Sequence, residues 1–325
     1  MTQDQQEQRP APDAARRVGL VGAGLIGAGW AAYFLAQGLE IWAYDPSPDA
    51  PEALRAQVAG VWPLMRRAGL VHIEGDAPPV RFASLAEVCA GADFILEQGP
   101  ESIALKRALM AEIDALAAPH VVIASSSSSL LPTDYQKDAA HPGRILGAHP
   151  FNPPSLVPLV EVVGGVLTDA SSVDWTVAFF RAVGKQPVRV NREQPGFVAN
   201  RMASALYREA VDLVATGVAS VEDVDAAISH GPGLRWAVMG PHLLYHLGGG
   251  AGGYRSYLDH LGPSQEVRWA SLNTTALTPE VREQLIAGVQ AELAALGLSR
   301  PEEARDEAIA DILAARAAHG PERPL

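Results

Sequence analysis

The segment RVGLVGAGLIG, Arg17 to Gly27, decides the fold of the first half of the chain. It begins as an apolar run that is typical of a buried strand and continues into glycines with the spacing GxGxxG. Residues 25–37 are rich in apolar side chains and predict a helix, and residues 40–45 predict a second strand that ends in Asp45. A strand, a glycine turn, a helix and a second strand ending in an acid are the parts of a Rossmann dinucleotide-binding unit.

The glycine turn predicts an NAD site. Gly22 permits the tight turn, Gly24 lets the backbone approach a pyrophosphate, and Gly27 lets the helix pack close to the strand. Asp45 would accept hydrogen bonds from the adenosine ribose and repel the 2′-phosphate of NADP, so NAD is favoured and FAD is a lesser competitor. A chance glycine turn is the alternative, and the strand, helix and acid around it argue against that. The predicted cofactor-binding residues here are Gly22, Ala23, Gly24, Leu25, Ile26, Gly27 and Asp45.

Strand-like and helix-like runs alternate up to about residue 195, and helical periods dominate afterwards. Such alternation is typical of βαβ units, whose right-handed crossovers stack into a parallel sheet with helices on both faces. The sequence therefore predicts an α/β fold, in which a Rossmann-type doubly wound sheet is followed by a smaller all-α domain. We expect a disordered tail over residues 1–16, a dinucleotide-binding domain over residues 17–194 and a helical domain over residues 195–325, with one of its helices at residues 234–247.

Composition narrows the class of partner. The chain has 325 residues, a formal net charge of -12 and one cysteine, Cys89. The acidic balance argues against nucleic acid and anionic membrane surfaces, because phosphate binding needs a concentrated positive field. A single cysteine permits neither a disulfide within the chain nor a thiolate metal cluster, which favours a reducing, cytoplasmic setting. We therefore expect neither nucleic acid nor a membrane as a partner, and the dinucleotide site predicts a small-molecule partner instead.

A histidine and a glutamate stand out later in the α/β region. His149 lies in the segment GAHPFNP, directly after a predicted strand. Glu161 stands inside the otherwise apolar strand LVEVV, where an unpaired buried carboxylate would be costly. It needs a partner, and a histidine is a natural one. A single histidine is more often structural than catalytic, and this second residue favours a catalytic role.

Five motifs in order, GAGLIG, ASSSSSL, GAHPFNP, LVEVV and PGFVANR, resemble those of the 3-hydroxyacyl-CoA dehydrogenase family. The resemblance covers the chain from Arg17 to about Gly262, and it implies a Rossmann domain, a dimerising helical domain and a homodimer. It also implies that His149 is the general acid and base and that Glu161 orients it. Asn200 would then bind the substrate oxygen as that oxygen changes between hydroxyl and carbonyl.

The serine run ASSSSSL could be a flexible linker, but residues 120–124 form a buried-strand pattern that leads directly into it. Aligned with the family's ASNTSSL, the run leaves Ser128 as the hydroxyl expected to meet both substrate and nicotinamide. Ser126 and Ser127 replace an asparagine and a threonine of the family pattern, so a neighbouring serine could carry the role instead.

Two further residues match family positions that contact the cofactor. These are Glu101 and Lys106, both in a predicted helix at residues 101–116. The alternative for this pair is that both side chains simply form the exposed face of that helix.

Two segments of the predicted helical domain indicate the class of substrate. Residues 230–249 and 252–263 resemble segments of the L-carnitine dehydrogenase branch of the family, whose substrate is a free 3-hydroxy acid with a trimethylammonium group. Trp236 and Tyr245 are candidates for cation–π contacts with that group, and Arg235 is a candidate partner for the carboxylate. All three could instead be structural.

The leading hypothesis is NAD-dependent oxidation of L-carnitine to 3-dehydrocarnitine. Oxidation of L-gulonate and oxidation of a 3-hydroxyacyl-CoA are alternatives, although residues 45–70 lack the lysines that CoA-binding members tend to present there. A crystallin-like structural or binding protein is the alternative that is not an enzyme. His242 and His246 have a helical spacing, but HLLYH lacks the glutamate of HExxH and an evident third ligand, so we expect no metal site.

Overall fold

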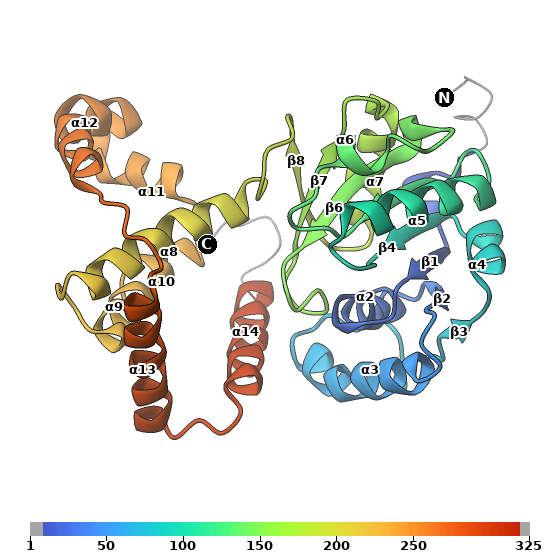
Figure 1. Ribbon diagram of the computed structural model, residues 1–325, viewed down its shortest axis with the longest axis horizontal. Helices are drawn as coiled ribbons and strands as arrows, with labels where there is room; N and C mark the ends of the chain where they lie inside the picture. Colours follow the sequence, from blue (N-terminus) through green and yellow to red (C-terminus); the bar gives the residue numbers. More distant parts are fainter. Residues whose placement is uncertain (1–8, 319–325) are drawn as a thin grey trace. The chain divides into compact units, whose positions relative to one another are not determined.

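The computed structural model describes residues 9–318, and the chain divides into two compact units (Figure 1). Unit 1 consists of Met1–Arg201 together with Asp306–Ala314, and unit 2 consists of Met202–Arg305 together with Ala315–Leu325. The chain first leaves unit 1 a few residues after the boundary expected near residue 195. It then returns to unit 1 through part of its last helix.

Unit 1 is built on one eight-stranded sheet with the order β3-β2-β1-β4-β5-β6-β7-β8. All neighbouring strands run parallel except β6 and β7, which are antiparallel. The predicted Rossmann-type doubly wound α/β fold is thus confirmed, and the antiparallel pair is an addition that the sequence pattern did not reveal. The strands are β1 (Arg17–Val21), β2 (Glu40–Tyr44), β3 (Arg81–Phe82), β4 (Phe94–Glu97), β5 (Val122–Ser125), β6 (Ile145–Pro150), β7 (Leu159–Gly164) and β8 (Gln186–Val190).

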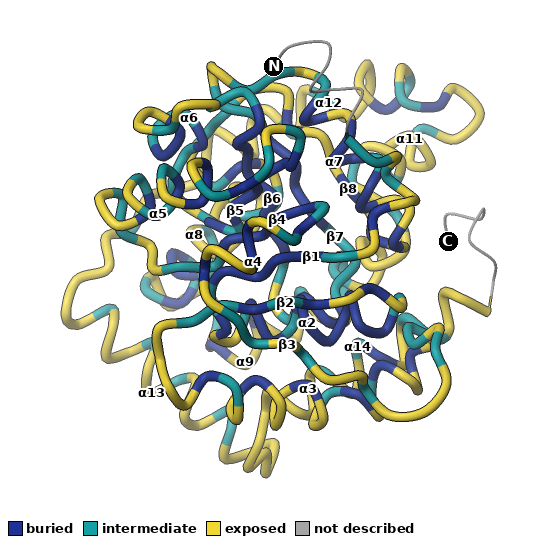
Figure 2. The backbone as a smooth tube through the Cα atoms, turned by 90° about the vertical axis from the view of Figure 1, so that its right-hand side faces the viewer, coloured by how far each residue is buried: buried dark blue, intermediate teal, exposed yellow. Residues whose placement is uncertain are grey.

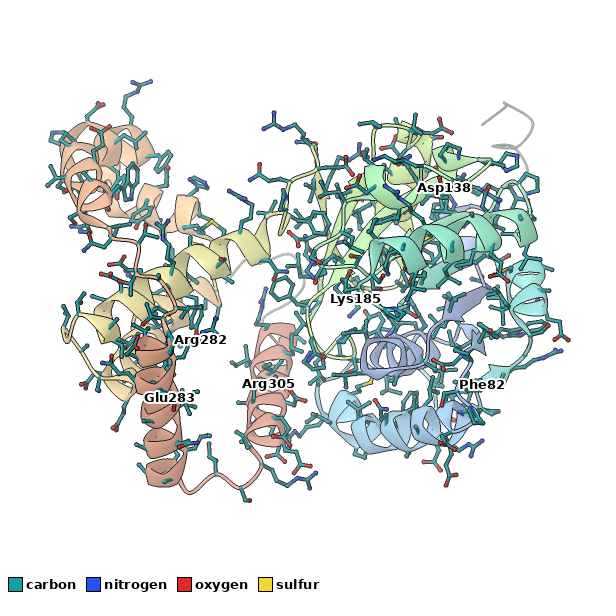
Figure 3. The ribbon with its side chains drawn as sticks, in the orientation of Figure 1. Phe82, Asp138, Lys185, Arg282, Glu283 and Arg305 are labelled. Carbon is teal, nitrogen blue, oxygen red and sulfur yellow. The ribbon has the colours of Figure 1, made fainter. Side chains whose placement is uncertain are left out.

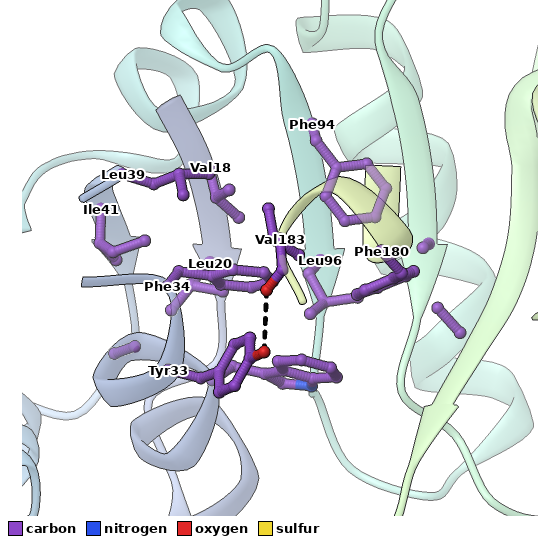
Figure 4. Close-up of a cluster of buried hydrophobic side chains, with 14 of the residues drawn as sticks. Val18, Leu20, Tyr33, Phe34, Leu39, Ile41, Phe94, Leu96, Phe180 and Val183 are labelled. Atoms are coloured by element: carbon purple, nitrogen blue, oxygen red, sulfur yellow. Dashed lines mark hydrogen bonds between the residues drawn. The ribbon is translucent and has the colours of Figure 1, made fainter. Parts of the chain in front are cut away.

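Helices cover both faces of this sheet, because the strands carry apolar side chains on both sides. One face packs against α2, α3 and α7, around the cluster of buried hydrophobic side chains drawn in Figure 4, and the other packs against α4, α5 and α6. Figure 2 shows the buried strands between these layers. The helices of unit 1 are α2 (Leu25–Ala36), α3 (Ala50–Arg67), α4 (Leu85–Gly91), α5 (Ile103–Leu116), α6 (Pro132–Tyr135) and α7 (Ala170–Ala182), with a short 3-10 helix η2 (Pro142–Arg144).

Unit 2 is all-helical in its described residues, as predicted. The single helix expected at residues 234–247 is wrong, because Gly240 and Pro241 interrupt it and Pro241 starts a new helix, where its missing N–H costs nothing. No helix between residues 9 and 318 combines the length and apolarity needed to span a membrane. The helices are α8 (Ala199–Ala215, begun in unit 1), α9 (Val221–Ser229), α10 (Pro232–Trp236), α11 (Pro241–Gly248), η3 (Gly250–Gly252), α12 (Gly253–Ser271), α13 (Pro279–Leu296) and α14 (Pro301–Ala318, partly in unit 1).

The tail expected over residues 1–16 differs in its described part. Residues 1–8 lie outside the described residues. Beyond them the chain packs on unit 1, since the Trp175 indole donates a 2.7 Å hydrogen bond to the carbonyl of Pro10 and Pro12–Ala14 forms the 3-10 helix η1. A buried indole N–H needs an acceptor, and this contact supplies one.

Candidate active site

The turn between β1 and α2 has the shape that its glycines predict. Gly22 has a φ of 105°, in the left-handed region that favours glycine. A Cβ on Gly27 would lie 2.2 Å from the carbonyl oxygen of Gly22, so a larger residue would push α2 away from β1. A Cβ on Gly24 would meet no heavy atom within 4 Å, which leaves this part of the backbone open to a ligand.

The N-terminus of α2 is free to bind an anion. Its first intrahelical hydrogen bond runs from the N–H of Ala28 to the carbonyl of Gly24. The N–H groups of Leu25, Ile26 and Gly27 therefore have no carbonyl acceptor within the helix. Unpaired N–H groups and the positive end of the helix dipole together favour a phosphate at this place.

Asp45 follows β2 and braces the glycine turn. Its carboxylate accepts a 2.8 Å hydrogen bond from the N–H of Ala23 and a 2.9 Å bond from the N–H of Ser47. Each carboxylate oxygen has a second lone pair, so Asp45 can still accept hydrogen bonds from a ribose. Asp45 thus stabilises the glycine turn through its backbone hydrogen bonds, and it also lines the pocket beside that turn.

A pocket of about 530 Å³ lies beside this turn, between the ends of β1 and β4. The strand order reverses there, which is where ligands bind in doubly wound sheets. The open Gly24 backbone, the free helix N-terminus and the carboxylate together fit an NAD molecule. Residues lining the pocket include Gly22, Gly24, Tyr44, Asp45, Gln98 and Pro100.

His149 and Glu161 face each other across the antiparallel strands β6 and β7. Nδ1 of His149 lies 2.9 Å from Oε2 of Glu161, and both side chains are buried. An ionised carboxylate only accepts hydrogen bonds, so in the neutral imidazole Nδ1 carries the proton and Nε2 keeps a free lone pair. The imidazole ring also contacts Phe151 and Phe197, with ring centroids 5.4 and 5.7 Å away. The ring is held in the tautomer that a general base requires.

The second oxygen of Glu161 binds the backbone ahead of Asn200. Oε1 accepts hydrogen bonds of 2.8 and 2.9 Å from the N–H groups of Val198 and Ala199. Burial alone would raise the pKa of Glu161, but the bond from His149 and the two backbone N–H groups outweigh it and lower that pKa. The carboxylate is therefore ionised at neutral pH.

Asn200 is placed by a strained turn. Gly196 has a φ of 75° and Phe197, a buried non-glycine residue, has a φ of 46°. Positive φ at a bulky residue is uncommon, and here the turn aims two successive N–H groups at Glu161. Asn200 follows at once as a half-buried residue in the first turn of α8.

The serine run is an ordered turn at the end of β5, and the hydroxyls of Ser125, Ser126 and Ser127 each have a different partner. Ser128 is half-buried, its N–H donates to Glu101 at 2.8 Å, and its hydroxyl makes only a long 3.4 Å contact with the same carboxylate. Ser128 therefore has the least committed hydroxyl of these four. The other bonds join Ser125 to Glu97 (2.7 Å), the Trp30 indole to Ser126 (3.1 Å) and Ser127 to Glu101 (2.7 Å).

Strand register brings the serine turn beside the histidine. In the parallel pair β5 and β6, Ser125 lies opposite Gly147. β5 ends at Ser125 and runs parallel to β6, so the serine turn that follows β5 leaves the same edge of the sheet as the end of β6, where His149 lies. The structure thus gathers the serine turn, the His149–Glu161 pair and the start of α8 in unit 1.

Glu101 and Lys106 do more than form the exposed face of a helix, because both side chains make specific contacts. Glu101 precedes α5, and its carboxylate accepts hydrogen bonds from Ser127 and Ser128 of the serine turn. Lys106 is buried, with its Nζ 2.8 Å from both oxygens of Glu97 and 3.4 Å from Ser125. The Lys106 ammonium is engaged with Glu97 inside the fold, and its contact with the cofactor stays a prediction. A buried ammonium requires such a partner. Lys106 supports the serine turn through Glu97.

The predicted substrate residues lie on two helices of unit 2. Arg235 and Trp236 belong to α10 and Tyr245 to α11, and all three are exposed. Tyr245 stacks on Tyr257 of α12 with ring centroids 4.6 Å apart. The structure does not unite the three side chains on one helix, so their contacts with substrate stay a prediction.

The two histidines of HLLYH secure the start of α12. Nδ1 of His242 lies 2.9 Å from the hydroxyl of Tyr254, and Nδ1 of His246 accepts a hydrogen bond from the N–H of Tyr254 at 3.1 Å. Between residues 9 and 318, no three His, Cys, Asp or Glu side chains gather as a metal site would require.

Lys185, labelled in Figure 3, is a buried residue that the sequence patterns did not single out. Its Nζ donates to the carbonyls of Pro154 (2.5 Å) and Val157 (2.9 Å) and lies 3.6 Å from the centroid of the Tyr33 ring. Burial holds the pKa of Lys185 well below its usual value. Lys185 thereby fixes the loop after His149 against α2. Its only signal in the sequence is rarity, since the chain has three lysines.

Comparison with known proteins gives consistent matches. Residues 17–194 match the family model of the 3-hydroxyacyl-CoA dehydrogenase NAD binding domain, and residues 196–287 match that of the 3-hydroxyacyl-CoA dehydrogenase C-terminal domain. An L-carnitine dehydrogenase of Streptomyces griseus is 45% identical, with 94% of this chain and 91% of that protein covered. One from Nocardiopsis dassonvillei is 47% identical, with 86% and 85% covered.

A solved structure extends the match to the fold. The crystal structure of an NAD⁺-dependent 5-formyl-3-hydroxy-2-methylpyridine 4-carboxylic acid 5-dehydrogenase superposes with a TM-score of 0.74 at 30% identity. The match covers 95% of this chain and all of that one.

Proposed function

This chain belongs to the 3-hydroxyacyl-CoA dehydrogenase family, and from that premise we propose that it oxidises L-carnitine to 3-dehydrocarnitine with NAD. The observation that carries the proposal is the buried His149–Glu161 pair, in a chain that is 45% and 47% identical to two L-carnitine dehydrogenases over most of its length. The chain is an NAD-dependent oxidoreductase by family, and the choice of a free 3-hydroxy acid as substrate is the proposal.

His149 is the proton acceptor in this reaction. Its Nε2 lone pair takes the proton of the substrate 3-hydroxyl while the hydrogen on the same carbon leaves as hydride. Bound NAD supplies the hydride acceptor. The imidazole becomes positively charged as the proton arrives, and the ionised carboxylate 2.9 Å from Nδ1 stabilises that charge. In the reverse direction His149 returns the proton to the carbonyl oxygen.

Ser128 and Asn200 are the proposed donors to the reacting oxygen. Support comes from the loosely bound hydroxyl of Ser128 and from the position of Asn200 directly after the N–H groups that bind Glu161. Donors aimed at the oxygen would hold it in place during proton and hydride transfer.

Arg235, Trp236 and Tyr245 are the proposed contacts for the two ends of the substrate. A quaternary ammonium has no N–H to donate, so aromatic faces must attract it, and Trp236 and Tyr245 present exposed rings. The exposed Arg235 would pair with the carboxylate. Tyr257, stacked on Tyr245, would fix the orientation of that ring.

The proposal includes a dinucleotide-binding domain over residues 17–194, a helical substrate and dimerisation domain over residues 195–325, and a homodimer in the cytoplasm. Exposed apolar side chains on α12 support pairing through the helical part, because an unpaired apolar surface of this kind is costly in water. They include Leu258, Leu261, Val267 and Trp269. Light scattering on the purified chain tests the dimer, and a monomer at micromolar concentration would contradict it.

Initial rates of NADH formation test the proposed substrate. L-carnitine, L-gulonate and 3-hydroxybutyryl-CoA are each supplied with NAD, and NADH absorbance is followed. L-carnitine should give the highest kcat/KM. Turnover of the thioester with inert carnitine would overturn the choice of a free 3-hydroxy acid, and preference for L-gulonate would overturn the ammonium contacts of Trp236 and Tyr245.

A further inference from the structure

Gln98 is the first residue after β4 and lies directly beside the glycine turn. Its N–H donates to the carbonyl of Val21, which extends the pairing of β4 with β1 by one residue. A Cβ on Gly22 would lie 2.9 Å from the carbonyl oxygen of Gln98, so the two backbones are in close contact. Gln98 also lines the pocket that fits the dinucleotide.

The side-chain amide of Gln98 has no protein partner. Among the described residues, neither its Nε2 nor its Oε1 makes a hydrogen bond, although both atoms are buried. A buried primary amide has two N–H donors and an acceptor, and folded proteins pair the large majority of such groups. The neighbouring polar groups are already engaged, since Asp45 binds the turn and Glu97 binds Lys106.

The amide lies next to the anion-binding end of α2. The position of a Cβ on Gly27 is 3.5 Å from Oε1 of Gln98, and Gly27 is the third residue of that helix. This is the helix turn whose free N–H groups favour a phosphate. A group with N–H donors and no partner, at a site that favours an anion, is suited to bind one.

We propose that the side-chain amide of Gln98 is a binding group for the pyrophosphate of NAD, and that it finds its hydrogen-bond partner only when the cofactor is bound. It adds a side-chain donor to the backbone donors of the glycine turn. The GxGxxG pattern does not include it, because Gln98 comes from the neighbouring strand.

NADH binding to purified variants, measured by fluorescence titration, tests this role. Gln98→Met keeps the length of the side chain and removes the donor, and Gln98→Glu replaces the donor with a carboxylate that repels phosphate. We expect the Kd for NADH to rise about tenfold in the first variant, the scale of one lost hydrogen bond to a charged group, and further in the second. The melting temperature without cofactor should not fall in Gln98→Met, because no protein hydrogen bond is lost.

Two comparisons make the result specific. Gln37→Met removes a hydrogen bond from Gln37 to the carbonyl of Leu70 at the far end of α2, so it should lower the melting temperature and leave the Kd for NADH unchanged. ADP-ribose should show the same weakening in Gln98→Met as NADH, and adenosine, which has no pyrophosphate, should show none.

An unchanged Kd for NADH in both Gln98 variants would overturn the proposal and mean that water satisfies the amide. Equal weakening of adenosine and ADP-ribose would overturn the pyrophosphate assignment. These outcomes are independent of the substrate, since a wild type that binds NADH but leaves carnitine unoxidised would contradict the proposed function alone.

Discussion

The carboxylate of Glu161 divides its two oxygens between His149 and the backbone before Asn200. One residue therefore fixes the tautomer of the base and the start of the helix that carries a proposed oxygen donor. An amide at this position would present an N–H toward one of these donors and leave it unpaired. Glu161→Gln should therefore lower kcat with L-carnitine by about 10²-fold or more, and the Kd for NADH should change little.

The pH dependence of the free energy of unfolding gives a second test of the role of Glu161. The pKa of its carboxyl is lower in the folded protein than its ordinary value of 4.5. Its ionised form therefore stabilises the fold at pH values above the unfolded pKa, and this contribution is lost as pH falls through the folded pKa. The difference in free energy of unfolding between wild type and Glu161→Gln, measured by urea denaturation, should be full at pH 7 and shrink below about pH 4.5. A difference that stays constant with pH would show that the carboxylate charge contributes nothing.

The serine turn separates structural from functional hydroxyls. Ser127 donates to Glu101 and accepts from the N–H of Leu130, whereas the hydroxyl of Ser128 is nearly uncommitted. Ser127→Ala should cost about 1 kcal/mol of stability, and Ser128→Ala should leave stability unchanged and lower kcat. Thermal melts and steady-state rates on both variants distinguish the two. If Ser128→Ala matched wild type in rate, the oxygen-binding role would pass to a neighbouring serine.

At the scale of the element, the junction of β1 and α2 joins folding and cofactor binding through two glycines. Gly27→Ala would place a methyl 2.2 Å from the carbonyl oxygen of Gly22, so it should destabilise the protein by about 1–3 kcal/mol or more. Gly24→Ala meets no protein atom within 4 Å and has an ordinary φ of -70°. It should leave the melting temperature unchanged while weakening NADH binding, because the methyl occupies the face where pyrophosphate approaches.

Calorimetric melts and NADH titrations check this pair together. Loss of stability in Gly24→Ala, or full stability in Gly27→Ala, would contradict the stated division between ligand approach and helix packing. The pair is informative because the two positions lie in the same turn.

At the scale of the whole molecule, the last helix returns to unit 1. Residues 306–314 of α14 belong to that unit, Ala310 is fully buried, and Arg67 of α3 pairs with Asp311 at 3.3 Å. This helix lies beyond residue 287, where the match to the family model of the C-terminal domain ends. It therefore contributes to the core of a domain that begins almost 300 residues earlier.

Replacing the buried Ala310 of α14 with a charged residue tests how much this helix stabilises unit 1. Ala310→Asp should lower the free energy of unfolding by about 2 kcal/mol or more, because an unpaired carboxylate would enter the core. Ala308→Asp, on an exposed position of the same helix, is the matched control and should have little effect. Equal melting temperatures of the two variants would show that α14 is not part of the folded core of unit 1.

The sequence predicted those features that local pattern carries. The GxGxxG turn with Asp45 indicated the dinucleotide unit, and the cost of a buried carboxylate indicated that Glu161 needs a partner. It could not predict the antiparallel pairing of β6 with β7, since strand direction is decided by tertiary packing, and that pairing places His149 opposite Glu161. Residue contacts set by distant segments were missed for the same reason. They include the burial of Lys106, the anchoring by Lys185, the unpaired amide of Gln98 and the return of α14.

The rate of carnitine-dependent NADH formation by His149→Ala, set beside its affinity for NADH, tests the central claim most directly. The account predicts that wild type forms NADH from L-carnitine, and that the variant binds NADH as wild type does but loses activity by about 10²-fold or more, because the proton acceptor is gone. A variant that kept the wild-type rate would contradict the assignment of His149 as the base. Lost NADH affinity would instead make His149 a structural residue.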